Sequence, residues 1–201
     1  MTKRLSPDAL RAAVGRLITM PEYVDVIIPR GGKSLVDRVL KEARAPVLGH
    51  LEGVCHVYID RDADLEKAVA ITVNAKMRRT GICGSAETLL IDRACLATHW
   101  RPIADALVAA GCELRGDAEL CRLDSRVKPA TEEDWRTEYL DAILSCRVVA
   151  DVDDAIRHIT TYGSAHTESI IASDPTAVER FLRDLDSAIV LHNASTQFAD
   201  G

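Results

Sequence analysis

The chain has 201 residues, of which 47% are hydrophobic and 28% charged, and its formal net charge is −6 at pH 7. This length and apolar fraction are typical of one large or two small globular domains, and they exclude a disordered chain. The sequence contains no long uncharged apolar run, no apolar stretch behind the basic residues at its start and no basic stripe. We therefore expect a cytosolic protein with no membrane span, no secretory signal and no nucleic-acid partner.

Six cysteines are present, and no two of them have the close paired spacing of a zinc site. A reducing compartment also disfavours disulfides. We therefore expect neither a structural metal nor a disulfide, and we expect chemistry from at most one or two thiols, the rest being small buried hydrophobic residues. The cysteines are Cys55, Cys83, Cys95, Cys112, Cys121 and Cys146.

The first 48 residues predict two helices and two short strands. Ser6-Pro7-Asp8 begins the first helix, because it combines a capping hydroxyl, a proline at the first helical position and an acid. The β-branched run 24–28 predicts a strand that Pro29 ends. A second helix follows Gly31 and Gly32, and residues 46–48 predict another strand.

Strands and helices alternate through the rest of the chain. This alternation predicts an α/β fold with a largely parallel sheet flanked by helices. No Gly-rich dinucleotide fingerprint precedes the first unit. The predicted strands are 56–59, 87–91, 142–149, 168–172 and 189–191, and the predicted helices begin at Asp64, Pro102 (ending at Gly111), Asp151 and Asp174.

Cys83 is the thiol that the local sequence favours. It lies in a glycine-rich loop just after a cluster of basic residues, where positive charge and free backbone N–H groups lower a thiol pKa and can hold an oxyanion. The alternative is that the glycines only form the turn and Cys83 fills a gap. The basic residues are Lys76, Arg78 and Arg79, and the glycines are Gly81 and Gly84.

Four histidines and two polar clusters fall at predicted strand ends or loops. Each histidine is either an acid–base group or a polar group satisfied in place. The clusters are 166–168 and 193–196, and active sites of α/β folds gather at strand ends, although both segments can also be simple turns. The acidic run 132–134 is expected to be a solvated loop. The histidines are His50, His56, His166 and His192.

Several long strings, in fixed order from about residue 10 to the last residue, resemble the gamma-glutamyl phosphate reductase family of the aldehyde dehydrogenase superfamily. The resemblance implies an aldehyde-dehydrogenase-like fold. It also implies NADPH-dependent reduction of L-glutamyl 5-phosphate to L-glutamate 5-semialdehyde with release of phosphate, the second step of proline biosynthesis. The strings are VIIPRGGKSL (26–35), PVLGHLEGVCHVYIDRDADL (46–65), NAKMRRTGICGSAETLLID (74–92), TEYLDAI (137–143) and HNASTQFADG (192–201).

The resemblance also implies roles for individual residues. Cys83 matches the nucleophile that forms a thioester, and Asn74 matches an asparagine that stabilises the oxyanion together with the Cys83 N–H. The alternative for Asn74 is a helix C-cap. Glu138 matches a glutamate that contacts the nicotinamide ribose. The resemblance further suggests substrate-binding roles for His166, Ser195 and Thr196 and cofactor-binding roles for Gly31 and Gly32.

One stretch departs from the superfamily. Aldehyde dehydrogenases that produce free acids carry a water-activating glutamate in an ELGG-like string, and here Gly49 or His50 takes its place. Loss of that base fits a reductase that must protect its thioester from water. The alternative is that Glu52 takes the place of the missing water-activating glutamate.

The resemblance covers only part of the family's length. It implies that 1–45 is the C-terminal remnant of a cofactor-binding domain and that 46–201 is the catalytic domain, truncated at its C-terminus. Because the phosphate-binding loops are then absent, we expect weak or no NADPH binding and no activity from this chain alone. A homo-oligomer and an association with glutamate 5-kinase are also implied.

Two alternatives stay open. The chain can be another oxidoreductase of the aldehyde dehydrogenase superfamily. It can also be a non-catalytic assembly module, which predicts a buried, unreactive Cys83 and an exposed apolar patch.

Overall fold

The structure, a computed structural model, describes residues 6–49 and 52–199. The chain divides into two units between Glu52 and Gly53. The domain boundary expected at residue 45 and the origin of the first unit as a cofactor-domain remnant stay predictions.

The first unit contains the two predicted helices, α1 (Pro7–Leu17) and α2 (Lys33–Glu42). The Ser6 hydroxyl caps α1 by accepting the Ala9 N–H at 3.2 Å, as its sequence predicts. Few apolar side chains of this unit are buried, so its helices have a small hydrophobic core. The buried ones are Ile18, Val36, Val39 and Ala45.

The prediction of two strands at 24–28 and 46–48 is wrong. They are reduced to one parallel bridge between Ile27 and Val47. A β-strand is stable when neighbours on a sheet satisfy its backbone groups and bury its side chains. Among the described residues of this unit, each of these segments pairs only with the other.

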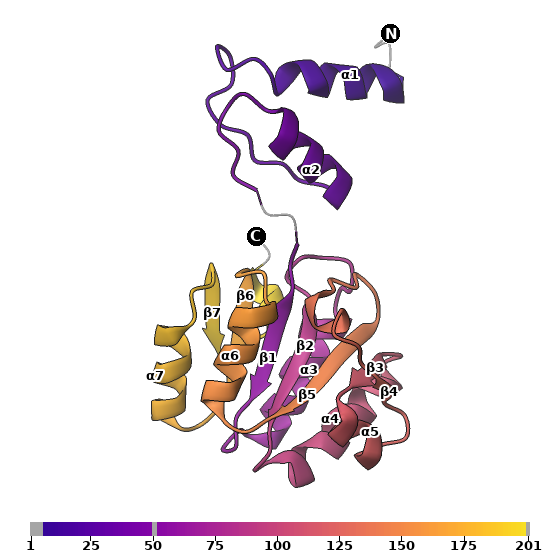
Figure 1. The fold of residues 1–201 in the computed structure, drawn as a ribbon, viewed down its shortest axis with the longest axis vertical. Coiled ribbons are helices and arrows are strands. Elements are labelled where there is room, and N and C mark those ends of the chain that lie inside the picture. Colours follow the sequence, from indigo (N-terminus) through magenta and orange to yellow (C-terminus); the bar gives the residue numbers. More distant parts are fainter. Residues whose placement is uncertain (1–5, 50–51, 200–201) are drawn as a thin grey trace. The chain divides into compact units, whose positions relative to one another are not determined.

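The second unit is built on a seven-stranded sheet in which every adjacent pair of strands is parallel (Figure 1). The strand order is β4-β3-β5-β2-β1-β6-β7. The predicted α/β class and parallel sheet are therefore confirmed. The strands are β1 (Cys55–Ile59), β2 (Ala86–Asp92), β3 (Glu113–Gly116), β4 (Lys128–Pro129), β5 (Ile143–Val149), β6 (Thr167–Ile171) and β7 (Ile189–His192).

Helices connect these strands, and most begin where the sequence predicts. An exception is α4, which begins before Pro102 and contains this proline in its interior. The buried face that includes Trp100, Ile103 and Leu107 outweighs the hydrogen bond lost at the proline. The helices are α3 (Leu65–Met77), α4 (Leu96–Ala109), α5 (Ala118–Leu123), α6 (Val152–Tyr162) and α7 (Pro175–Asp184), with 3₁₀ helices at Asp134–Arg136 and Thr196–Ala199.

The sequence did not predict β3, β4 or α5, which are short. Within residues 6–49 and 52–199, no helix combines the length and the apolar character that a membrane crossing requires.

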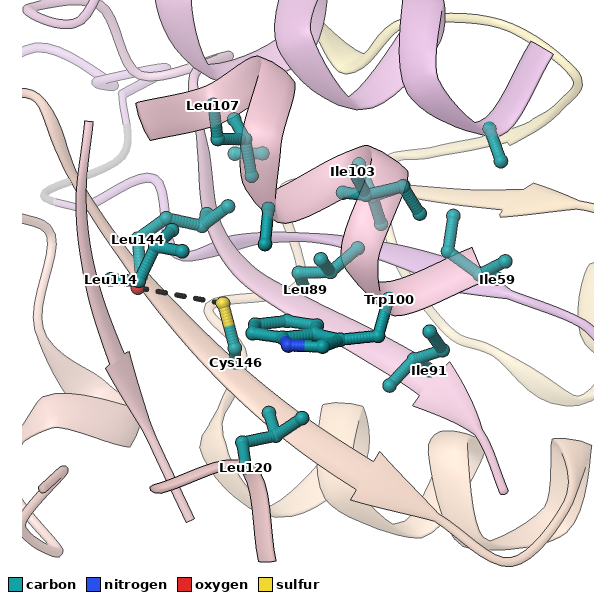
Figure 2. Packing of buried hydrophobic residues seen from close by; sticks show 14 of the residues in the cluster. Ile59, Leu89, Ile91, Trp100, Ile103, Leu107, Leu114, Leu120, Leu144 and Cys146 are labelled. Carbon is teal, nitrogen blue, oxygen red and sulfur yellow. Dashed lines mark hydrogen bonds between the residues drawn. The ribbon is translucent and has the colours of Figure 1, made fainter. Parts of the chain in front are cut away.

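Side chains alternate between the two faces of the central strands. Val57 and Ile59 of β1 enter the cluster under α3 and α4, whereas Tyr58 enters the cluster under α6 and α7. Trp100 and Leu89 both lie in the first cluster, and the Cys146 thiol there donates to the Leu144 carbonyl at 3.7 Å (Figure 2). Because helices cover both faces, a site has to form at the ends of the strands.

Candidate active site

At the carboxyl edge of the sheet, the polar groups bind one another. The Tyr58 hydroxyl donates to Asp60 at 3.1 Å and to Asp92 at 3.2 Å, and Arg61 forms an ion pair with Asp92 at 3.1 Å. Burial and the two carboxylates raise the pKa of the Tyr58 hydroxyl. These groups therefore hold the turns that follow β1 and β2.

Cys83 lies at the opposite edge, in the loop between α3 and β2. Its side chain is half-buried. The strands β1, β2 and β6 begin side by side there, with Cys55 paired to Ala86 and His56 paired to Glu168. The candidate thiol is therefore at the amino ends of the strands, whereas ligands of open α/β sheets usually bind at the carboxyl ends.

Gly53 packs directly on the peptide of Cys83. A Cβ at Gly53 would lie 2.1 Å from the Cys83 carbonyl oxygen and 2.7 Å from its Cα, so only glycine fits. The Gly53 N–H donates to Glu138 Oε1 at 3.0 Å. Gly53 thus joins the segment of Glu138 to the loop of Cys83, a contact across 85 residues that local sequence patterns did not predict.

Cys55 and His166 complete this edge. The Cys55 thiol donates to the Cys83 carbonyl at 3.1 Å, and its sulfur lies 3.6 Å from His166 Nδ1. The same His166 nitrogen lies 2.8 Å from the Thr167 hydroxyl. The structure therefore places His166, a predicted substrate-binding residue, next to the Cys83 loop.

Lys76 does not add free positive charge to this loop, and that part of the prediction is wrong. Its side chain is fully buried and forms an ion pair with the equally buried Glu87 at 2.6 Å. Burial raises the pKa of the Glu87 carboxyl to about 7, although Lys76 and the backbone N–H groups of Leu140 and Tyr139 act in the opposite direction. The pair ties the end of α3 to the start of β2 on either side of the loop.

The other five thiols are harder to ionise than a free cysteine. Burial raises the pKa of Cys95 and of Cys112 to about 12, and it raises the pKa of Cys55 and Cys146 well above the ordinary value. Cys121 was expected to be buried but is half-buried. Its partial burial and the nearby Asp117 still raise the pKa of its thiol.

All six cysteines lie in the described part of the chain, and none forms a disulfide. Among the described residues there is no cluster of three His, Cys, Asp or Glu able to hold a metal ion.

Asn74 lies within α3, and the C-cap of that helix is Arg78, so the C-cap alternative for Asn74 is wrong. Its side-chain Oδ1 is buried without a hydrogen-bond partner among the described residues.

Ser195 and Thr196 are buried, and Ser195 Oγ accepts the Gln197 N–H at 3.3 Å. Gln197, which the sequence did not single out, lines a pocket beside the Cys83 loop.

The remaining candidates are distributed elsewhere. His50 lies outside the described residues. His56 is fully buried with its Nδ1 2.9 Å from Glu168, so both residues belong to the interior. His192 is exposed, and its Nε2 lies 3.0 Å from the Ala172 carbonyl.

The acidic run 132–134 is not fully solvated, contrary to the expectation from the sequence. Asp134 is buried and forms an ion pair with Arg115 at 2.7 Å.

Gly31 and Gly32 belong to the first unit and lie at the start of α2. Gly32 is the N-cap of that helix, and α2 has no side-chain cap. A Cβ at Gly32 would meet no atom within 4 Å, so the first turn of α2 is open on that side.

Comparisons with known proteins show strong similarity along almost the whole chain. No protein-family model matches. A protein of Parvibaculum lavamentivorans named gamma-glutamyl phosphate reductase is 60% identical over 199 residues, which are 98% of this chain and 47% of that protein. The crystal structure of gamma-glutamyl phosphate reductase from Thermotoga maritima superposes with a TM-score of 0.91 at 40% identity, covering 98% of this chain and 47% of that one.

More distant structures share the fold. An acetylating aldehyde dehydrogenase from Geobacillus thermoglucosidasius has a TM-score of 0.72 at 22% identity and covers 94% of this chain and 50% of that one. A glyceraldehyde-3-phosphate dehydrogenase from Methanocaldococcus jannaschii, solved as a complex with NADP, has a TM-score of 0.73 at 15% identity, with 92% and 49% covered. The fold is therefore that of aldehyde dehydrogenases.

The chain spans about half the length of the curated relatives that it matches. We conclude that this chain is homologous to the gamma-glutamyl phosphate reductases and corresponds to about half of such a protein.

Proposed function

We propose that the chain is the thiol-bearing part of an enzyme that reduces L-glutamyl 5-phosphate to L-glutamate 5-semialdehyde and releases phosphate, the second step of proline biosynthesis. The observation that carries the proposal is the 60% identity to a gamma-glutamyl phosphate reductase along 98% of the chain. The geometry agrees, since the half-buried Cys83 is set in a tightly packed loop while the other thiols have raised pKa values.

The proposed chemistry begins at the Cys83 sulfur. Its thiolate attacks the acyl carbon, the bond from that carbon to the phosphate oxygen breaks, and phosphate leaves with the electron pair, so that Cys83 carries a thioester. NADPH, when bound, would supply a hydride to the thioester carbonyl carbon. The resulting thiohemiacetal anion on Cys83 would then collapse, breaking the carbon–sulfur bond, so that the aldehyde is released and the Cys83 thiolate is returned.

Other residues of the chain support this chemistry in the proposal. The Asn74 amide and the Cys83 N–H stabilise the oxyanion at the acyl carbon. His166, Ser195 and Thr196 belong to substrate-binding segments. The proposed partners of the whole protein are L-glutamyl 5-phosphate, further copies of the chain and glutamate 5-kinase.

The residues proposed for the cofactor have a fitting local structure. The uncapped first turn of α2 after Gly31 and Gly32 suits a phosphate group, because its N–H groups have no side-chain acceptor. The bond from the Gly53 N–H fixes the Glu138 carboxylate beside the Cys83 loop, which suits a contact to a ribose hydroxyl. We keep the proposal that this half chain alone binds NADPH weakly or not at all and is inactive.

A second candidate, a non-catalytic assembly module, is favoured by the exposed apolar side chains of the first unit. Leu10 is 51% exposed and Leu17 is 54% exposed, and Tyr23 reaches 75%. Exposed apolar side chains mark a docking surface where they form a contiguous patch. The reactivity of Cys83 distinguishes the two candidates, because an assembly module needs no reactive thiol.

The experiment is pH-dependent alkylation of the folded chain, with the six thiols mapped by peptide mass spectrometry. We expect Cys83 to react fastest, with an apparent pKa below that of a free thiol, about 8.5. Cys121 is the internal control, because it is also half-buried but has a raised pKa. If Cys83 reacts no faster than Cys121, the catalytic proposal for this chain is overturned and the assembly candidate is favoured.

A further inference from the structure

A small pocket beside the Cys83 loop has basic walls. It measures about 240 Å³ and is lined by Arg78, Arg79, Ile82, Gln197 and Phe198. Arg78 and Arg79 follow the last turn of α3, and Gln197 and Phe198 come from the 3₁₀ helix Thr196–Ala199. None of the five lining residues is acidic, although the chain as a whole is acidic.

Among the described residues, the two arginines have no acidic ion-pair partner. Both side chains are exposed. Other arginines of this unit are paired, for example Arg93 with Glu119 at 2.6 Å. A guanidinium is charged at every physiological pH and presents several donors to a carboxylate or phosphate. The pocket thus has the charge and the donors that an anion requires.

Gln197 engages two of the backbone carbonyl groups that would oppose an anion there. Its side-chain Nε2 donates to the Ala75 carbonyl at 2.8 Å and to the Arg79 carbonyl at 3.1 Å. Carbonyl groups at the end of a helix carry partial negative charge. Because the buried Gln197 amide occupies two of them, the end of α3 repels an anion less than a bare helix terminus does.

The pocket adjoins the reacting thiol in the sequence, since Ile82 in its wall precedes Cys83. We infer that this pocket binds an anionic oxygen group of the substrate, either its phosphate or its α-carboxylate, through Arg78 and Arg79. The identity of the ligand rests on the proposed function, whereas the anion site rests on the pocket itself. The phosphate and the α-carboxylate lie at opposite ends of the substrate, so the substrate would be oriented in opposite directions in the two cases.

The test is an NMR titration of the whole 201-residue chain at constant ionic strength, in which the side-chain Nε–Hε signals of the arginines are followed. The probes are inorganic phosphate and L-glutamate. We expect saturable shifts of the Arg78 and Arg79 signals. In the single variants Arg78→Ala and Arg79→Ala, the signal of the remaining arginine should report about tenfold or greater weakening of affinity. Arg122→Ala is the matched control, because Arg122 is exposed at the end of α5, away from the pocket.

The outcomes separate the possibilities. Tighter binding of phosphate supports the pocket as the site of the reacting phosphate, and tighter binding of L-glutamate supports it as the site of the α-carboxylate. Shifts that do not saturate, or that Arg122 shows equally, overturn the anion site. Alkylation of Cys83 in the same sample without anion tests the proposed function by itself, so an anion site with an unreactive Cys83 counts against that function only.

Discussion

Gly53 is the residue whose size controls the Cys83 loop. A methyl group there would overlap the Cys83 carbonyl and Cα, which belong to the backbone and cannot move aside easily. We expect Gly53→Ala to lower the alkylation rate of Cys83 at least tenfold and to destabilise the chain by about 1–3 kcal/mol. The measurements are peptide mapping after alkylation and urea unfolding.

Gly81→Ala is the control for this prediction, because it lies in the same loop and its Cβ would meet only the Leu140 oxygen at 3.9 Å, an ordinary contact. Equal reactivity of Cys83 in the Gly53→Ala and Gly81→Ala variants would show that the loop adapts and that Gly53 does not set its geometry.

The buried carboxyl of Glu87 gives the stability of the chain a pH dependence. Its pKa is raised to about 7 in the folded chain, whereas an unperturbed glutamate titrates at about 4.3. Between these pH values the folded chain binds more protons than the unfolded chain. The contribution of Glu87 to the free energy of unfolding is therefore fully present below pH ~4.3 and is lost as the pH rises to about 7.

Glu87→Gln tests this dependence, because glutamine does not titrate. Glutamine keeps the size of the side chain but loses the carboxyl group that contacts Lys76, so the substitution has a cost in the free energy of unfolding. We expect that cost to be larger at about pH 6 than at about pH 8, by roughly 1 kcal/mol, in urea unfolding. Glu119→Gln is the control, since Glu119 pairs with Arg93 near the surface, where a pair contributes about 1 kcal/mol or less. A pH-independent cost of Glu87→Gln would contradict the raised pKa.

At the scale of elements, two N-caps of similar chemistry differ in what they hold. The Asp64 carboxylate caps α3 by accepting the Lys67 N–H at 2.9 Å. The Asp117 carboxylate caps α5 by accepting from Glu119 and Leu120, and its second oxygen also accepts the Val148 N–H of β5 at 2.8 Å. Asp117 therefore joins a helix to the sheet.

This difference predicts unequal costs for the same substitution. We expect Asp64→Ala to lower the free energy of unfolding by about 1 kcal/mol, the usual cost of losing a cap. Asp117→Ala should cost about 2–3 kcal/mol, because it also leaves the Val148 N–H without its acceptor. Urea unfolding measures both, and equal costs would mean that water replaces Asp117 at β5 without penalty.

At the scale of the whole molecule, the two units differ in how much apolar surface they bury. The second unit has two large clusters on the faces of its sheet, whereas the first buries a few side chains such as Val36 and Val39. Local opening is easiest where few apolar contacts have to break.

We therefore expect hydrogen exchange to separate the units. Amides of β1, β2 and β5 should open only with global unfolding, at about 5–15 kcal/mol, and amides of α1 and α2 should open several kcal/mol more easily. Exchange followed by mass spectrometry measures this, with α6 as a helical control in the second unit. Equal protection of α2 and α6 would contradict the prediction.

The sequence by itself determined the types of most elements and where several of them begin. Ser6 and Asp64 are caps in the structure because a cap depends only on residues two or three positions away. The alternation of strands and helices was enough to predict the parallel sheet. The loop of Cys83 was found from its glycines and basic neighbours, together with the family resemblance.

Only the tertiary structure decided the contacts between distant residues. Lys76 looked like a free charge in the sequence, and its burial against Glu87 depends on how α3 packs on β2. Gly53 on Cys83 and Gln197 on the end of α3 likewise join segments far apart in the chain. Residues 24–28 have strand composition, but among the described residues they pair only through the single bridge between Ile27 and Val47. Local preferences act through nearby backbone, whereas burial and pairing depend on partners that only the fold brings together.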